Sequence, residues 1–316
     1  MIDFSNKKST RVGFAKGLGE LSKNKNIWAI SADLSESIGM SDFIKNAPER
    51  FIECGIAEQN AVAVSAGICM SNSQNISIFG SFAEFLPSRC LDQIRISVCM
   101  QNLNVKLIGG HSGLSYGGDG ESIQAFEDIA IMRTLPNMKV LVPASSAEAY
   151  KMTLEMVKMH GPVYMRLNRE PDVELFEEEK IGGDFHGPLC SGRDLLIIAT
   201  GTMVSQSLLA AKDIQEKTNL TSTVYNASII KPFPIHEIVE LAKKHKTIIT
   251  CEEHQIVGGL GSLISEIVSE YIPIKVCRIG IKDVFGQSGS VEELRKYYKV
   301  DSNGIVEQIL DFLNSN

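Results

Sequence analysis

Short apolar runs rich in β-branched residues alternate with longer amphipathic segments along almost the whole chain. Nine short runs have the length and composition of buried strands: Ile27–Ala32, Ile76–Phe79, Val105–Ile108, Lys139–Val142, Val163–Leu167, Leu195–Ala199, Ser222–Tyr225, Thr247–Cys251 and Ile274–Ile279. Seven longer segments predict helices: Thr10–Ser22, Glu58–Met70, Phe82–Met100, Ser146–His160, Val204–Lys217, His236–Lys244 and Leu260–Tyr271. Such alternation is the signature of βαβ units on mainly parallel sheets. We therefore predict an α/β protein with doubly wound sheets.

The alternation stops between Asn168 and Arg193, where the sequence is acidic and contains proline and glycine without a sustained period. Such a stretch is typical of a connector between domains. We predict a first domain at residues 1–170, a linker at 171–190 and a smaller second domain at 191–316. Each domain is long enough to form a doubly wound unit of its own.

Charge and hydropathy exclude several classes of partner. The 316 residues carry a formal net charge of −7, which argues against a surface for nucleic acid or anionic membranes. The longest uncharged run, which includes residues 60–82, is interrupted by asparagine, serine and glutamine, so no membrane span is expected. The first ten residues lack the apolar core of a secretory signal.

The chain has seven cysteines, all in helix-like or strand-like apolar segments. None forms a CxxC pair, and no cluster of histidine and cysteine has the spacing of zinc ligands. We predict buried free thiols in a protein of the reducing cytoplasm, and no metal site.

A carboxylate stands at the start of an unusually apolar helix. The predicted helix Glu58–Met70 has no charged side chain after Glu58, and a helix that is apolar on every face is buried on all sides. A carboxylate in the first turn gains from the positive end of the helix dipole. It also needs a hydrogen-bond partner, because burying an unpaired carboxylate costs several kcal/mol. Backbone N–H groups, water or a ligand could be that partner.

Two further stretches combine aromatic, glycine and ionisable residues. Phe82 and Phe85 are three residues apart at the start of a predicted helix, which places both rings on one face. Six glycines lie between positions 109 and 120, directly after a strand, around His111 and Asp119. Each feature alone also fits a structural role, as a core aromatic pair, a satisfied histidine or a tight crossover.

In this order and spacing, the three stretches resemble the transketolase family of thiamine-diphosphate enzymes, and more narrowly the C-terminal subunit of a split transketolase. The resemblance covers essentially the whole chain, and its segments are collinear: SADLSES, GIAEQNAV, FGSFAEF, GGHSGLSYGGDG, TLPNMKVLVPAS, GPVYMRLNR, EEHQIVGGLGS and FGQSG. It implies a pyrimidine-binding domain of the thiamine-diphosphate fold, followed by a smaller transketolase-type C-terminal α/β domain.

The resemblance implies that Glu58 activates the cofactor. In this family the matching glutamate hydrogen-bonds N1′ of the aminopyrimidine and favours the imino tautomer, whose nitrogen removes the proton from C2 of the thiazolium. This chemistry needs a protonatable oxygen in a dry, preorganised slot. Phe82 and Phe85 match the aromatic positions that pack on the pyrimidine ring. Asp33 matches an acidic residue close to the cofactor.

For the substrate, the resemblance places His111, also a catalytic candidate, and Asp119 near the sugar hydroxyls. Ser37 and Arg169 match positions that hold the phosphate of a sugar phosphate, and the planar guanidinium of arginine can bind phosphate through two hydrogen bonds. Arg166 is a further candidate from the same strand end. Its alternative role is an ion pair with the acidic linker.

Two glycine-rich motifs do not match the cofactor sites that they suggest. GGDG at 117–120 differs from the diphosphate and magnesium motif of thiamine enzymes, because the next asparagine, Asn137, lies too close and before a strand. GGLGS at 258–262 lacks the spacing and the acidic residue of a dinucleotide fingerprint. The chain thus has no predicted residues for Mg²⁺ or diphosphate, and the resemblance assigns both to an N-terminal transketolase subunit.

Position 123 departs from the family pattern. Family members usually carry a histidine where this sequence has Ile123, and often an acidic residue where it has Gly118. That histidine hydrogen-bonds near the donor ketose, whereas isoleucine can neither donate nor accept. Losing such a contact typically costs about 1–3 kcal/mol. We therefore expect a modified ketose or a 2-oxoacid as donor, rather than ordinary pentose phosphates alone.

The predicted function is transfer of a two-carbon ketol unit from a ketose or its phosphate to an aldose, in an α2β2 heterotetramer with two copies of this chain. The second domain is expected to help this chain pair. A decarboxylating relative, such as 1-deoxyxylulose-phosphate synthase or the β chain of a 2-oxoacid dehydrogenase, is one alternative. A paralogue that has lost turnover is another, although retention of Glu58, Phe82, Phe85, His111 and Asp119 argues against it.

Overall fold

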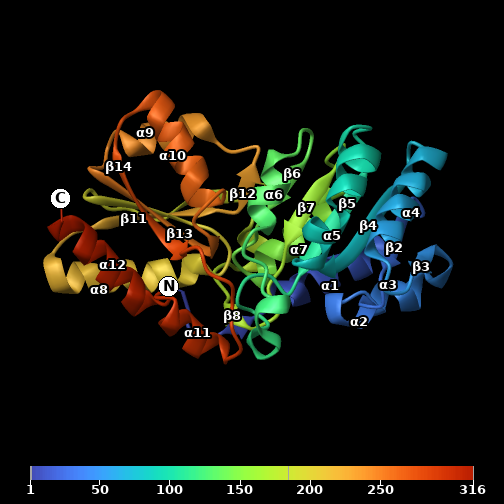
Figure 1. Cartoon of the computed structure of the whole chain (residues 1–316), viewed down its shortest axis with the longest axis horizontal. Coiled ribbons are helices and arrows are strands. Elements are labelled where there is room, and N and C mark those ends of the chain that lie inside the picture. The colour runs from blue at the N-terminus through green and yellow to red at the C-terminus, as the bar shows by residue number, and fades with distance from the viewer. Residues whose placement is uncertain (1, 184, 316) are drawn as a thin grey trace.

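In the computed structural model, which describes residues 2–183 and 185–315, the chain forms two sheet-based domains that lie end to end (Figure 1). Each of the nine predicted strands and seven predicted helices overlaps an observed element of the same type. The predicted α/β fold class, with mainly parallel sheets, is confirmed.

The first domain is built on a seven-stranded sheet with the order β12-β6-β7-β5-β4-β2-β3. These strands are β2 (Ile27–Ser31), β3 (Phe51–Glu53), β4 (Ile76–Phe82), β5 (Val105–Gly110), β6 (Lys139–Leu141), β7 (Val163–Arg166) and β12 (Ile229–Lys231). All pairs are parallel except the pair of β12 with β6. Every residue of β4 and β5 is buried, as expected for central strands covered on both faces.

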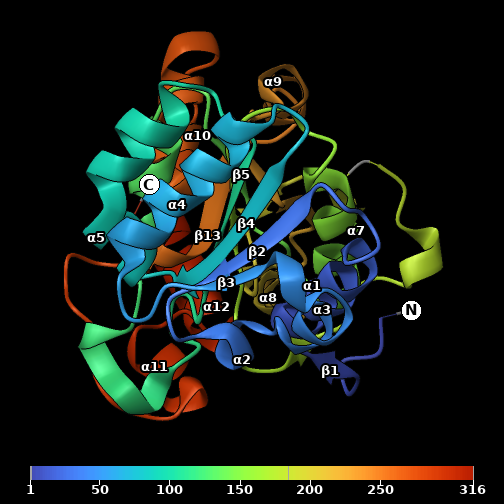
Figure 2. The same ribbon diagram turned by 90° about the vertical axis from the view of Figure 1, so that its right-hand side faces the viewer.

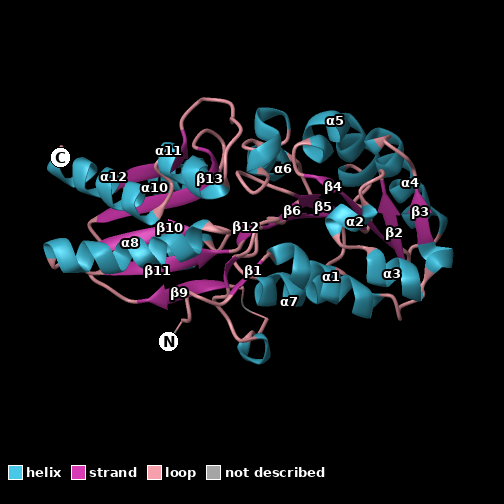
Figure 3. Ribbon diagram, turned by 90° about the horizontal axis from the view of Figure 1, so that it is seen from below, coloured by secondary structure: helices cyan, strands magenta, loops and turns pink. Residues whose placement is uncertain are grey.

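Helices cover both faces of this sheet (Figures 2 and 3). On one face lie α1 (Thr10–Leu21), α3 (Ser41–Asn46) and α7 (Ser146–Met156), and on the other lie α4 (Glu58–Ser71), α5 (Phe85–Gln93) and α6 (Asp128–Thr134). Three short helical segments adjoin them: α2 (Ser35–Ile38), η1 (Pro48–Arg50) and η3 (Gly117–Ser122). A π-helical segment, η2 (Ile94–Cys99), continues α5. The helices α1 and α7 approach closely at Gly13, and only glycine permits this approach. A Cβ on Gly13 would lie 1.9 Å from the carbonyl oxygen of Ser146.

The second domain has a five-stranded sheet with the order β14-β13-β10-β11-β9. Its strands are β9 (His186–Cys190), β10 (Leu195–Ala199), β11 (Ser222–Ala227), β13 (Thr247–Gln255) and β14 (Lys275–Ile281). On one face lie α8 (Met203–Thr218) and α12 (Ser302–Asn314), and on the other lie α9 (Ile235–Ala242) and α10 (Leu260–Tyr271) (Figure 1). The short helix α11 (Val291–Tyr297) reaches back toward the first domain (Figure 1).

The segment predicted as a linker, residues 171–190, is more ordered than expected. Its start forms β8 (Asp172–Val173), which pairs with β1 (Lys7–Lys8), and η4 (Glu178–Lys180) follows. Its end forms β9, the antiparallel edge strand of the second sheet. Strand β12 crosses in the opposite direction, because it belongs to the second half of the chain and pairs with β6 in the first sheet. We propose that the second domain begins at His186. Two segments, the predicted linker and β12, then connect the domains.

The predicted position of Phe82 in a helix is wrong. Phe82 is the last residue of β4, and α5 begins at Phe85. The two rings still lie close, with centroids 5.4 Å apart, but they meet across a strand-to-helix turn and not along one helix face. The alternation of Ile76, Ile78 and the following apolar residues extends the strand further than its β-branched portion indicated.

Five cysteines are buried free thiols, as predicted, but two are not buried. Cys190 is exposed and Cys54 is half-buried. Cys190 lies on the edge strand β9, where side chains alternate between the core and solvent. Within the described residues, no helix has both the length and the apolarity needed to cross a lipid bilayer.

Candidate active site

The carboxyl ends of β2, β4 and β5 meet at one edge of the first sheet. These strands are direct neighbours, and Phe82 at the end of β4 pairs with Gly110 at the end of β5. Asp33 follows β2 and His111 follows β5, so three of the predicted residues come together because parallel strands end at the same edge. Asp33 is exposed, and its backbone N–H donates to Glu53 Oε1 at 2.7 Å.

Glu58 begins α4, as predicted, and its side chain is only 6% exposed. Its Oε1 accepts a hydrogen bond from Arg89 Nη1 at 2.9 Å. The Arg89 guanidinium also lies over the Phe85 ring, 3.6 Å from its centroid. The buried carboxylate therefore has a protein partner that the sequence analysis did not identify. The signal was present, since Arg89 follows Phe85 by four residues and so shares its helix face.

Four aromatic rings form a continuous wall beside Glu58 and Arg89. Phe82 contacts both Phe85 and the imidazole of His111, whose centroid is 4.2 Å away. Tyr116, from the glycine-rich loop, stands edge-on to His111 at 5.1 Å. Arg169 lies over the outer side of Tyr116, 4.6 Å from its centroid. Tyr116 was missed in the sequence analysis, and it connects His111 to Arg169.

His111 has a strained backbone and an unpartnered ring nitrogen. Its φ is 57°, in the left-handed region that costs energy for a residue with a Cβ. It is 3% exposed, and its buried Nδ1 has no hydrogen-bond partner among the described residues. Burial first, and then the positive charges of Arg169 and Arg11, lower the pKa of His111 to about 3. The imidazole is therefore neutral at pH 7.

Ser37 reaches the same edge of the sheet through α2. Arg11 donates to the carbonyl oxygen of Ser37 at 3.0 Å, and the charge of Arg11 also acts on His111. The absence of a side chain at Gly110 makes room for Ile38, because a Cβ there would lie 2.5 Å from Ile38 Cδ1. Asp119 is exposed on η3, beyond Tyr116. The structure thus links Ser37 to this edge through Arg11, and Arg169 to His111 through Tyr116.

Arg166 is not available to a substrate. It is 6% exposed, and its Nε donates to Asp128 Oδ2 at 2.8 Å. Its Nη2 donates to the carbonyl oxygens of Ala125 and Glu253, both at 3.0 Å. The proposed phosphate contact and the alternative ion pair with the linker are both wrong, because the end of β7 faces α6 and the second domain. Arg166 fixes one domain against the other.

Ile123 is partly buried beside the aromatic wall, in the hydrophobic cluster that contains Phe82. Its neighbour Gln124 is held by the second domain, since its amide donates to the carbonyl oxygen of Gln287 at 3.0 Å. Among the described residues, no group of three or more histidine, cysteine, aspartate or glutamate side chains could hold a metal ion.

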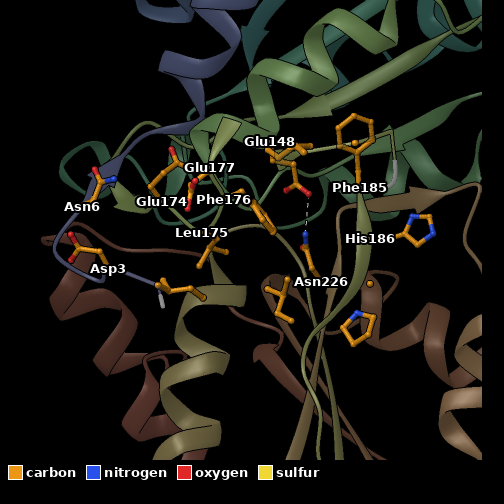
Figure 4. Close-up of a pocket in the computed structure, with 16 residues that line it drawn as sticks. Asp3, Asn6, Glu148, Glu174, Leu175, Phe176, Glu177, Phe185, His186 and Asn226 are labelled. Atoms are coloured by element: carbon orange, nitrogen blue, oxygen red, sulfur yellow. Dashed lines mark hydrogen bonds between the residues drawn. The ribbon is translucent and has the colours of Figure 1, made fainter. Parts of the chain in front are cut away.

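Among the described residues, several cavities lie where the domains meet, and two of them border the predicted linker or its start. One, of about 520 Å³, is bordered by Tyr116, Arg169 and Arg295. The other, of about 790 Å³, is bordered by the N-terminal segment, α7, the predicted linker and the end of β11 (Figure 4). In it Glu148 accepts a hydrogen bond from Asn226 at 2.9 Å, and burial raises the pKa of Glu148 to about 7. The predicted site residues lie outside this larger cavity.

Comparison with known protein families agrees with this geometry. Residues 6–171 match the family model described as the transketolase pyrimidine binding domain, and residues 188–305 match the transketolase C-terminal domain. The chain belongs to the transketolase family. The two models together cover most of the chain, and the candidate site lies within the pyrimidine binding domain.

Relatives of similar length support placement within the transketolase family. The chain is 37% identical over 309 residues to a putative transketolase C-terminal section from Methanocaldococcus jannaschii, and the match covers 96% of each chain. It is 34% identical over 310 residues to a subunit of the apulose-4-phosphate transketolase of Phocaeicola vulgatus, covering 96% of this chain and 97% of the relative. A solved split-gene transketolase, described as an inactive β4 tetramer, superimposes with a TM-score of 0.87 at 36% identity, covering 97% of this chain and 98% of that one.

Proposed function

We propose that this chain is the C-terminal subunit of a thiamine-diphosphate-dependent transketolase, active only with a partner subunit, that transfers a two-carbon ketol unit from a ketose donor to an aldose acceptor. The observation that carries the proposal is the buried carboxylate of Glu58 beside the adjoining rings of Phe82 and Phe85. An acid at the start of an apolar helix can hydrogen-bond an aminopyrimidine, and the aromatic faces beside it can pack on the pyrimidine ring.

The residues present fit thiamine diphosphate on its pyrimidine side. Glu58 offers a carboxylate of which Arg89 engages only Oε1, and Phe85 offers a ring already stacked with a planar cation. When bound, this cofactor supplies the carbon nucleophile that attacks a ketone. Glu58 would hold a proton against the pyrimidine ring, and the dipole of α4 would favour its charged form whenever that proton moves. Phe82 and Phe85 would exclude water from this bond.

The substrate would lie between His111 and Arg169. The neutral imidazole of His111 would hydrogen-bond a hydroxyl or carbonyl oxygen of the substrate. Asp119, exposed on the same loop, can accept from a sugar hydroxyl. Arg169 and Ser37 would hold a phosphate, and Asp33 would contribute near the cofactor. Ile123 leaves an apolar surface where the family carries a histidine, so we propose a ketose that lacks a polar group at that point.

The surface of α4 and the adjoining helix supports a partner and self-association. Helix α4 is apolar, yet one face is open: Met70 is 67% exposed, and Ile56 just before it is 76% exposed. Met100, after η2, is 62% exposed. Contiguous patches of exposed apolar side chains mark interaction surfaces, and we propose that these residues belong to one. The solved split-gene relative is described as an inactive β4 tetramer, which fits a chain that self-associates and has no turnover alone. The partner subunit would hold Mg²⁺ and the diphosphate, and the seven free thiols fit an assembly in the cytoplasm.

The test is reconstitution. The chain is purified with the subunit that carries the diphosphate motif, and the complex is assayed with thiamine diphosphate, Mg²⁺, a panel of ketoses and an aldose acceptor. We expect aldehyde-dependent ketol transfer, with no turnover by either subunit alone. Release of CO₂ from pyruvate in place of ketol transfer would identify a decarboxylating enzyme. No turnover by a complex that binds the cofactor would support the inactive paralogue.

A further inference from the structure

The glycine-rich loop at residues 111–120 is shaped by the second domain. It contains four glycines, so its own backbone has few conformational restraints and ordering it is entropically costly. It also carries His111, Tyr116 and Asp119, which form much of the candidate site. The contacts that hold this loop therefore decide where those side chains lie.

The strongest of these contacts is a carboxylate from β13. Glu253 Oε2 accepts a hydrogen bond from the backbone N–H of Leu114 at 3.1 Å, and the Glu253 side chain is only 2% exposed. The neighbouring Gly113 has a φ of 58°, and a Cβ there would lie 2.5 Å from Glu253 Oε2. The loop thus wraps directly around the carboxylate, and only glycine permits this approach.

A second residue fixes the same carboxylate. Arg295, on α11, donates from Nε to Glu253 Oε1 at 3.0 Å and from Nη2 to Asp172 Oδ2 at 2.9 Å. Asp172 is in turn held by the hydroxyl of Ser205 at 2.7 Å. Because both carboxylates are buried, charge-assisted bonds to one guanidinium are strong and hold Glu253 in a single orientation.

Weaker contacts from the same domain support the far end of the loop. Gly289 donates its backbone N–H to the carbonyl oxygen of Gly117 at 3.0 Å. Gln287 donates to Gln124 Oε1 at 3.1 Å. These bonds involve neutral groups in the segment 286–289, so they add less than the charged contact at Leu114.

We propose that Glu253 and Arg295 are positioning residues, which hold the 111–120 loop in the shape that binds substrate. This assigns to the second domain a part in substrate binding, and it rests on the proposed function for its kinetic consequence. Glu253 reaches the loop at Leu114, and Arg295 reaches the loop through Glu253.

The test compares Arg295→Gln with Lys296→Gln in the full chain, alone and in the reconstituted complex. Lys296 is the adjacent residue on α11, where it forms an exposed ion pair with Glu292, so the control makes the same change of charge outside the network. Hydrogen exchange of the isolated chain should become about ten-fold faster in peptides covering residues 112–122 for R295Q, and not for K296Q. In the complex, the KM for the ketose donor should rise about ten-fold for R295Q, while the Kd for thiamine diphosphate stays unchanged.

The two readouts separate this proposal from the proposed function. A wild-type complex without ketol transfer would refute the proposed function. The exchange experiment would still test whether Glu253 and Arg295 hold the 111–120 loop. Wild-type exchange in residues 112–122 of R295Q would overturn the proposal. Faster exchange with an unchanged KM would also overturn it, because the loop would then have no bearing on substrate.

Should R295Q fail to fold, Arg295→Lys is measured in its place. A lysine keeps the charge but reaches only one of the two carboxylates, so exchange and KM should both increase about three-fold. No change in either quantity would overturn the proposal.

Discussion

The carboxyl ends of the two sheets differ in how their polar residues are held: the first has strained backbone and a polar atom without a partner among the described residues, and the second has hydrogen-bonded carboxylates. At the first sheet, Asp33 and His111 have positive φ angles of 62° and 57°, and the buried Nδ1 of His111 has no partner within the described chain. At the second sheet, Glu252 accepts from the backbone N–H groups of Leu260 and Gly261 at 2.7 and 2.8 Å. Glu253 is likewise bonded to Leu114 and to Arg295.

The comparison indicates what each edge is for. Strain and unsatisfied atoms persist only where the surrounding structure enforces them, and they collect at functional sites. We infer that the first edge binds the ligand of the proposed function. The second edge uses its carboxylates on the protein, to begin α10 and to hold the loop of the first domain. Substitutions at the first edge should therefore alter chemistry, and those at the second should alter stability or loop position.

The largest effect is expected at Glu58. In the reconstituted complex, Glu58→Gln removes the acid that we propose relays the proton, so kcat should fall about 10³-fold, within the range of general acid–base catalysis. Because glutamine has nearly the same shape, the free energy of unfolding should change by less than about 1 kcal/mol. Steady-state kinetics and urea denaturation measure both quantities. Wild-type kcat in a folded E58Q complex would contradict the mechanism.

A smaller effect, on stability alone, is expected at Glu252. Burial raises the pKa of Glu252 to about 7 from its ordinary 4.5. The folded state then binds the proton more tightly than the unfolded state, so stability falls as pH rises from about 4.5 to about 7. A shift of this size corresponds to roughly 3 kcal/mol. Glu252→Gln should lose that part of the pH dependence.

The measurement for Glu252 is urea denaturation at several pH values between 4.5 and 8. Burial also raises the pKa values of Glu84 and Glu148 to about 7, so the difference between wild type and E252Q isolates the one group. Glu270→Gln, at an exposed position on α10, is the matched control and should follow the wild-type curve. If E252Q kept the full wild-type slope, the assignment would be wrong.

A substitution at position 123 should change specificity by about one order of magnitude. Ile123→His restores a hydrogen-bonding side chain beside the aromatic wall, so kcat/KM for an ordinary pentose phosphate should rise about ten-fold. Ile123→Leu keeps the apolar surface and serves as the control. High activity of the wild-type complex on xylulose 5-phosphate and ribose 5-phosphate would contradict a non-standard substrate.

The smallest effect is expected at Arg89. Its side chain is 46% exposed, so the ion pair with Glu58 is partly screened by water. Arg89→Ala should lower the free energy of unfolding by about 1 kcal/mol, because Glu58 keeps the favourable end of α4. Arg95→Ala, at an exposed position on η2, is the control. A loss well above that of R95A, by more than about 3 kcal/mol, would mean that Glu58 depends on Arg89 alone.

Much of the fold could be predicted because it is encoded in local patterns. The start of α4 at Glu58 was predicted correctly, since an acid before an uninterrupted apolar run favours a helix N-terminus. The meeting of Phe82 and His111 follows from parallel strands ending at one edge. The exact end of β4 could not be read in this way, because Phe82 is compatible with both a strand and a helix.

The sequence by itself determined the nine strands and seven helices that it predicted, and that His111 follows the end of β5, because both depend on residues close together in the chain. Only the tertiary structure decided that β12 joins the first sheet, that Arg166 is occupied by Asp128, and that Glu253 holds the loop at Leu114. Each of these links joins residues between 38 and 139 positions apart, or strands from different halves of the chain. The spacing of apolar residues predicts the structure of one segment. Contacts between distant residues form only when the whole core is packed.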